Sequence, residues 1–280
     1  MRHVAQQVSR LLVACSIAAL FAAPCLASEP TEEASEFLRL SGLDRYLGAI
    51  EHQFVDSITS REEQIPLGNR SLLIRVVAEA HSAHRLKQTA LSHLDEQFDS
   101  RLADEVLSWL RSPAILRITK LTAATSGPEW KPHKQAYGRA LQQRAPTPSR
   151  LALVQRVDSA SKATDTGIRV AEAASMAVLS ALNAANGYPM TTEALEREID
   201  SRGAQRHSTL YRETVVSFLY SYRDLPDPAL EHYAEFLETE AGQWYSELTA
   251  GSVAAALGLA ARKLEASLRR ELAVSRSQWQ

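Results

Sequence analysis

The sequence predicts an all-α protein, and three observations lead to that fold class. Apolar residues recur at steps of three and four through most of the chain, which is the spacing of one helix face. Serine, threonine and asparagine stand where several of these stripes begin, as helix-capping residues do. The alternation of apolar and polar residues that is typical of strands is not evident. We therefore expect a helical bundle.

The first half of the chain is predicted to hold four helical stretches. Asn69 is a plausible cap for the second of them, which is expected to continue past residue 80 as far as Phe98. Ser112 and Pro113 open the fourth, because the serine oxygen can accept a free backbone N–H and proline has no N–H to leave unpaired. The predicted stretches are 43–58, 72–98, 102–110 and 113–124.

The second half follows a segment rich in proline and glycine. Residues 125–149 carry four prolines, and the stretch 145–149 is the best candidate for a linker or hinge. Asp227-Pro228 is expected to begin a short helix, and Thr239 is expected to cap a long final one. The predicted helices are 133–143, 150–182, 195–219 and 227–237 and the one that follows Thr239, with a turn at 186–189.

The first 27 residues have the three parts of a secretory signal. Arg2, His3 and Arg10 supply positive charge before an apolar run at 11–23, which is shorter than the roughly 20 residues of a membrane span. Cleavage near Ala27 would send the protein to the periplasm or outside the cell. Alternatives are cleavage after Ala22 or Ala23, a lipid anchor at Cys15 or Cys25, or an ordinary buried helix.

Composition excludes several function classes for the mature chain. Both cysteines lie in the signal, so the chain after Ala27 can form no disulfide and no cysteine metal site. The net charge of the full sequence is −2, and no basic block points to a nucleic acid partner. No stretch after the signal is long and apolar enough to predict a transmembrane segment.

The two halves of the mature chain resemble each other weakly. Aligning the sequence so that Trp109 matches Phe236 also matches Ser112 with Thr239. Each half thus has an aromatic helix end, a hydroxyl cap and a following helix. Internal duplication and chance similarity both explain this, and the expected domains are 28–145 and 146–280. The residues predicted to shape these hairpin corners are Trp109, Ser112, Pro113, Phe236, Thr239, Gly242 and Trp244.

The second corner carries a family resemblance. The run Tyr233-Ala-Glu-Phe236-Leu-Glu-Thr239-Glu-Ala-Gly242 resembles a widespread family of small helical bacterial periplasmic proteins, catalogued only as a domain of unknown function. The pattern typical of that family looks like an aromatic helix end, a Ser-Pro pair and a glycine two residues after the pair. Here each corner carries only part of the pattern. The first has the Ser112-Pro113 pair but Ile115 in the place of the glycine, whereas the second has Gly242 but Thr239-Glu240 in the place of the pair. The resemblance implies an exported helical fold and brings no catalytic residue.

Metal and catalytic chemistry find little support in the sequence. His81 and His84 would share a face of one predicted helix, but a metal site needs further ligands, and we interpret both as solvated. The paired carboxylates, such as Asp95-Glu96, are interpreted as charged outer faces. We predict no catalytic residue, no metal and no cofactor.

The expected function is therefore a non-enzymatic one. We expect an exported accessory or protein-interaction module of the cell envelope, with the partner and the oligomeric state not indicated by the sequence. One alternative is a periplasmic carrier that binds an apolar ligand between helices, and a second is a cell-wall-acting hydrolase. The aromatic residues around Trp244 and Tyr222 are interpreted mainly as core, with a binding patch as the alternative.

Overall fold

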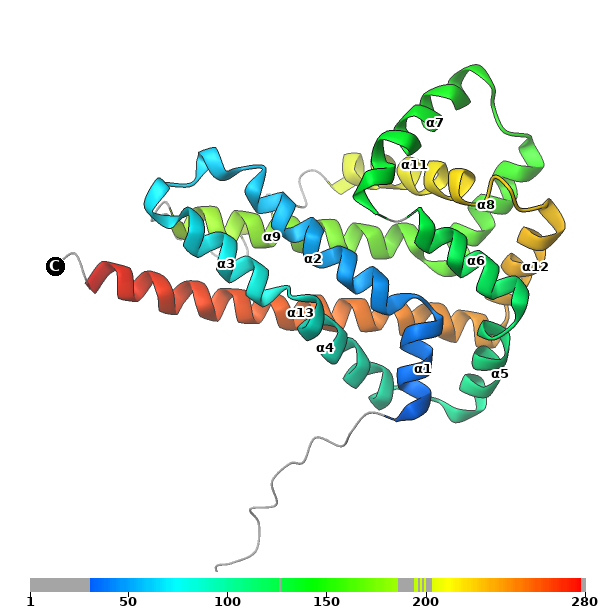
Figure 1. The fold of residues 1–280 in the computed structure, drawn as a ribbon, viewed down its shortest axis with the longest axis horizontal. Coiled ribbons are helices and arrows are strands. Elements are labelled where there is room, and N and C mark those ends of the chain that lie inside the picture. The colour runs from blue at the N-terminus through cyan, green and yellow to red at the C-terminus, as the bar shows by residue number, and fades with distance from the viewer. Residues whose placement is uncertain are drawn as a thin grey trace, which may run out of the picture. The chain divides into compact units, whose positions relative to one another are not determined.

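Helices make up most of the chain that the structure describes, as Figure 1 shows. A computed structural model describes residues 31–125, 127–185 and 203–277, together with residues 194, 195, 197 and 199. No strand occurs within these residues, so the predicted all-α class is confirmed. The predicted signal and the predicted turn at 186–189 lie outside the described residues.

The first half begins with a helix that sequence periodicity did not reveal. Helix α1 starts after Thr31, whose Oγ1 accepts the backbone N–H of Ala34, and two glutamates in its first turn complement the helix dipole. Its buried residues include Phe37, which has no exposed surface. The helices of this half are α1 (Glu32–Leu40), α2 (Leu43–Thr59), α3 (Arg70–Ala80), α4 (Ala83–Glu96), α5 (Ser100–Leu110), α6 (Pro113–Ala124) and α7 (Lys131–Gln143).

The predicted helix 72–98 is two helices. Helix α3 ends at Ala80 and α4 begins after Ser82, so His81 lies in the turn between them and His84 lies in the first turn of α4. His81 is also buried, with its ring stacked on Phe54 at a centroid distance of 3.9 Å. The interpretation of His81 as solvated is therefore wrong, whereas His84 is exposed.

The second half shows a similar break. The predicted helix 150–182 is wrong, because Lys162 adopts a left-handed conformation with φ of 55° between two helices. Buried Asp158 fixes this joint by accepting hydrogen bonds from the backbone N–H and the hydroxyl of Thr164. The helices of this half are α8 (Pro148–Ser161), α9 (Ala163–Ala185), α11 (Gly203–Ser221), α12 (Asp227–Leu237) and α13 (Glu240–Ser277).

The order of neighbouring helices is similar in the two halves. Helix α1 packs on α2, α4 and α5, and α8 packs on α9, α11 and α12 in the same order along the chain. Helices α5 and α12 precede the two predicted corners and each lead into a helix with a hydroxyl cap. This arrangement fits an internal duplication, which stays a prediction.

The last helix joins the two halves. Helix α13 contacts α3, α4 and α5 of the first half as well as α8, α9 and α12 of the second (Figure 1). Gly251 permits the close approach to α4, because a Cβ there would lie 2.9 Å from Nε2 of His93. The described residues from Thr31 onward form one compact unit, and no helix among them is long and apolar enough to cross a membrane.

Candidate interaction site at the helix corners

The two predicted corners meet in space. Trp109 at the end of α5 stacks on Phe236 at the end of α12, with ring centroids 3.9 Å apart and an interplanar angle of 13°. Tyr233 is also nearly parallel to Trp109, at a centroid distance of 5.6 Å. The corner aromatics therefore contact each other across the halves, in addition to packing within their own hairpins.

Each corner is set by the same local capping arrangement. Ser112 Oγ accepts the N–H of Ile115 at the start of α6, and Thr239 Oγ1 accepts the N–H of Gly242 at the start of α13. Pro113 occupies the first turn of α6, where its missing N–H costs no hydrogen bond. These caps hold Trp109 and Phe236 at the helix ends.

Gly242 makes the second corner tighter than the first. A Cβ at Gly242 would lie 2.0 Å from the carbonyl oxygen of Phe236 and 2.6 Å from the Cα of Leu237, far inside van der Waals contact. Ile115 stands at the matching place in the first corner and has a side chain there. Only the corner between α12 and α13 thus requires a glycine.

A larger aromatic cluster surrounds this stack, and we call it the aromatic corner. Buried Phe37 packs against Trp244 and Tyr245, with ring centroids 6.1 and 5.5 Å apart. Except for Phe37, its members are only half-buried, so their edges reach the surface. The aromatic corner consists of Phe37, Phe98, Trp109, Tyr233, Phe236, Trp244 and Tyr245.

Polar atoms inside the aromatic corner are poorly solvated. Nε1 of Trp109 is buried and has no hydrogen-bond partner among the described residues. Burial raises the pKa of the Tyr233 and Tyr245 hydroxyls well above the usual value for tyrosine. Both phenols therefore stay neutral at physiological pH, and the corner presents an uncharged aromatic surface.

Three ion pairs involve residues that lie within one helical turn of members of the aromatic corner. The guanidinium of Arg111 binds both carboxylate oxygens of Glu36, at 3.0 and 2.5 Å, and holds the pKa of Glu36 below its usual value. Arg156 binds Glu238 in the same two-bond manner and lowers the pKa of that carboxyl. The third pair joins the start of α5 to the start of α13, where Arg101 meets Glu240 at 2.7 Å.

No protein-family model, curated protein or solved structure matches this chain.

The aromatic residues expected to be core divide into two groups. Tyr220 and Tyr222 are buried, as a core interpretation predicts. Phe218, Trp244 and Tyr245 are half-buried and belong to the surface as well as to the core. Only these half-buried residues offer surface to the binding-patch alternative, which stays a prediction.

The paired carboxylates and the other possible metal ligands form no metal site within the described residues. Asp95 accepts hydrogen bonds from the N–H and the hydroxyl of Thr31, and these bonds lower the pKa of its carboxyl. This carboxylate helps to hold the start of α1, while its neighbour Glu96 is exposed. In the described part of the chain, no three His, Cys, Asp or Glu side chains gather closely enough to hold a metal.

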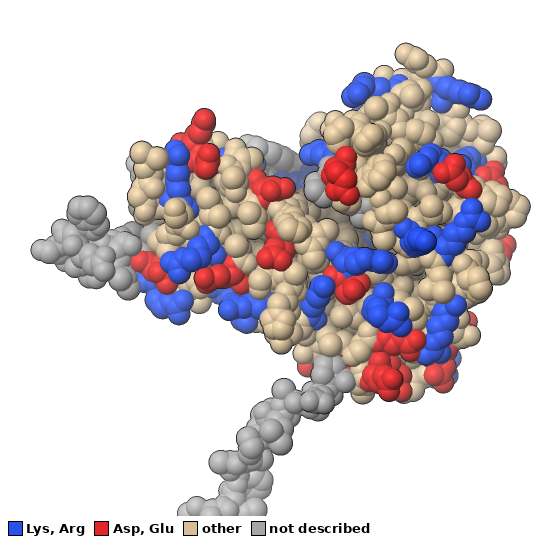
Figure 2. Space-filling model, in the orientation of Figure 1, with Lys and Arg blue, Asp and Glu red and all other residues tan. Residues whose placement is uncertain are grey.

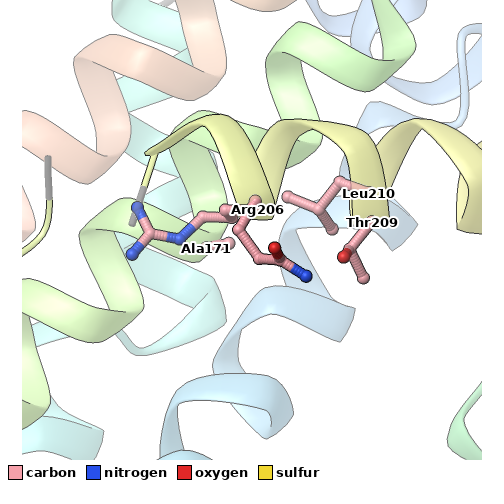
Figure 3. A pocket seen from close by; sticks show the side chains of 5 residues that line it. Ala171, Arg206, Thr209 and Leu210 are labelled. Atoms are coloured by element: carbon pink, nitrogen blue, oxygen red, sulfur yellow. The ribbon is translucent and has the colours of Figure 1, made fainter. Parts of the chain in front are cut away.

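A shallow hollow lies between α9 and α11, with a volume of about 320 Å³ (Figure 3). Ala171, Arg206, Thr209 and Leu210 line it with Gln205, and its mouth is open to solvent. The guanidinium of Arg206 is already 3.5 Å from Glu172 and 3.4 Å from the carbonyl oxygen of Ile199. An open hollow whose one charged side chain among the described lining residues is already paired is typical of a surface dimple between two helices.

Proposed function

We propose that the protein is an exported, non-enzymatic accessory module of the cell envelope that binds a protein partner through the aromatic corner. The signal pattern in residues 1–27 and the resemblance of the second corner to a periplasmic family support the location. The half-buried aromatic cluster supports the binding role, and it is the observation on which the proposal depends.

The composition of the aromatic corner resembles that of a protein-binding hot spot. Tryptophan and tyrosine are enriched at such centres because they bury a large area while losing little side-chain freedom. Charged groups typically form the rim, where water still reaches them. Here each of the pairs Arg111–Glu36, Arg156–Glu238 and Arg101–Glu240 includes a residue within one helical turn of a ring in the aromatic corner.

A photocrosslinking experiment in the protein's own host tests this role. A photoreactive amino acid replaces Glu240, which is 73% exposed and lies one helical turn before Trp244. The matched control carries the same group in place of Glu63, an exposed residue in the short 3-10 helix Glu62–Gln64. We expect one adduct of defined mass from position 240 and none from position 63.

A charge-reversal variant then tests whether the rim contributes. Arg101 is exposed and the photoreactive group has already replaced its partner Glu240, so Arg101→Glu should leave the fold intact. We expect the adduct to weaken, because the variant puts a negative charge beside position 240 where the rim carried a positive one. The absence of an adduct at position 240, or an equal yield from both positions, would contradict the proposal.

The exported location has its own measurement. Intact mass spectrometry of the protein from a periplasmic fraction should give a chain that begins near Ser28. Retention of residues 1–27 in a cytoplasmic fraction would overturn the location, and the crosslinking result would then be judged separately.

A further inference from the structure

Basic residues dominate one continuous part of the chain. Of the ten charged residues between positions 106 and 157, nine are lysine or arginine, and Glu129 is the single acidic one. The whole chain has a net charge of −2, so this excess of positive charge is local. The segment includes α6, α7 and most of α8.

Three of these nine cations have carboxylate partners from other parts of the fold. Arg111 binds Glu36 and Arg156 binds Glu238, as described above. Arg150 is only 13% exposed and meets Asp227 at 2.7 Å. These three therefore serve to hold helices together.

The other six cations have no carboxylate within 4 Å in the described part of the chain, and we call them the cationic surface. Five are exposed, and Lys134 is half-buried with its pKa lowered by that burial. Figure 2 shows lysine and arginine atoms at several points over α6 and α7. The cationic surface consists of Arg117, Lys120, Lys131, Lys134, Arg139 and Arg144.

The fold holds the two helices of this surface firmly. Helices α6 and α7 both pack on α11. Thr125 at the end of α6 forms a buried hydrogen bond of 2.6 Å with Ser221, and the Tyr137 ring of α7 packs edge-on against Tyr220. The cations therefore project from a rigid support.

An apolar side chain lies among the cations. Leu116 is 43% exposed and lies one turn from Lys120 on the same side of α6, opposite the buried Ile115 and Ile118. An exposed leucine with Arg117 next to it and Lys120 one turn away suits the boundary between lipid headgroups and acyl chains. An acidic protein surface would match the charges but would give Leu116 no corresponding role.

We propose that the cationic surface docks the protein onto a membrane rich in anionic phospholipids, with Leu116 inserted at the headgroup level. Each lysine or arginine near such a surface strengthens binding by about fivefold at moderate salt. Negative headgroups would also offset the desolvation of Lys134. This inference does not depend on the aromatic corner, which remains free for a protein partner.

Vesicle co-sedimentation of the full mature chain tests the proposal. We expect binding to vesicles of phosphatidylcholine mixed with phosphatidylglycerol, weak binding to pure phosphatidylcholine, and loss of binding at high salt. The double variant Lys131→Gln with Arg139→Gln should weaken binding by about twentyfold. Leu116→Ser should also weaken it, because the inserted apolar surface is lost.

A matched control distinguishes this surface from the other exposed basic residues. Arg262 and Lys263 on α13 are equally exposed, so Arg262→Gln with Lys263→Gln removes the same charge elsewhere. We expect that control to change affinity by less than the α7 variant does. Equal binding to neutral vesicles, equal effects of the two double variants, or no binding to anionic vesicles would overturn the proposal. Circular dichroism and thermal melting establish that every variant is folded.

Discussion

Trp109 and Phe236 occupy matching positions in the two halves and stack on each other at 3.9 Å. The predicted internal duplication would place such a contact on a pseudo-twofold axis, where a residue meets its own counterpart, as in a symmetric dimer interface. The stack is a direct contact between the two hairpins. Its removal should affect the stability of both halves together.

Trp109→Ala should lower the free energy of unfolding by about 2–3 kcal/mol, since it leaves a gap between the rings of Tyr233 and Phe236. Trp109→Phe should cost about 1 kcal/mol or less, because it keeps a ring and removes the buried N–H that has no partner. Urea denaturation followed by circular dichroism measures both. Equal costs for the two variants would show that stacking is not the main contribution.

Gly242→Ala should destabilise the protein by about 2 kcal/mol or more, because the new Cβ would lie 2.0 Å from the Phe236 carbonyl oxygen. Gly48→Ala is the matched control within α2, where a Cβ meets nothing within 4 Å. That change should stabilise by about 0.5–1 kcal/mol through helix propensity. The two melting temperatures should therefore move in opposite directions.

Local signals in the sequence predicted the corners well. The Ser112-Pro113 pair predicted the start of α6, and Thr239 predicted that of α13, because a cap acts on the residues next to it. What the sequence could not show was that Trp109 would meet Phe236. That contact depends on how the two hairpins pack, and no local pattern encodes such packing.

Both helix breaks that the sequence missed depend on buried polar groups. The bend at Lys162 is held by Asp158, a carboxylate that a sequence pattern places on the polar face of a single long helix. The break at His81 likewise leaves an imidazole inside the core. Helix α1 was missed although Thr31 and its two following glutamates were a readable start signal.

The cationic surface was overlooked for a different reason. Its residues are spaced too widely to form a basic block, and clustered charge is the usual sequence signal of a charged surface. The readable signal was the near absence of Asp and Glu across residues 106–157.

The stability of the protein should fall as the pH decreases from about 6.5 to about 4. Burial lowers the pKa of His81 to about 4, and its Nδ1–H donates to the carbonyl oxygen of Val77. The unfolded chain therefore binds the proton first, and the loss is complete below the folded-state pKa, at roughly 3 kcal/mol. Chemical denaturation at a series of pH values measures this slope.

His81→Gln should flatten that part of the pH profile, since glutamine does not titrate. His84→Gln is the control, because His84 is exposed two residues into α4 and should leave the slope unchanged. A profile of His81→Gln that still fell between pH 6.5 and 4 would assign the effect to another group.

Asp158→Ala should destabilise the joint between α8 and α9 by about 2–3 kcal/mol. The change leaves the N–H and the hydroxyl of buried Thr164 without their acceptor. Asp158→Asn should cost less, because its amide oxygen can still accept one of these bonds. Faster hydrogen exchange of the Thr164 amide would report the loosened joint directly. The amide of Ile115, which the Ser112 side chain accepts, serves as the internal reference and should exchange at an unchanged rate.

The position of α13 also determines when the fold can be completed. This helix is synthesised after α3, α4 and α5, yet it covers all three. The earlier helices therefore keep part of their apolar faces uncovered until α13 has emerged, and long-range pairing of this kind delays folding. Late completion of the fold would suit the export proposed above, because a polypeptide crosses a membrane through the secretory route in an extended form.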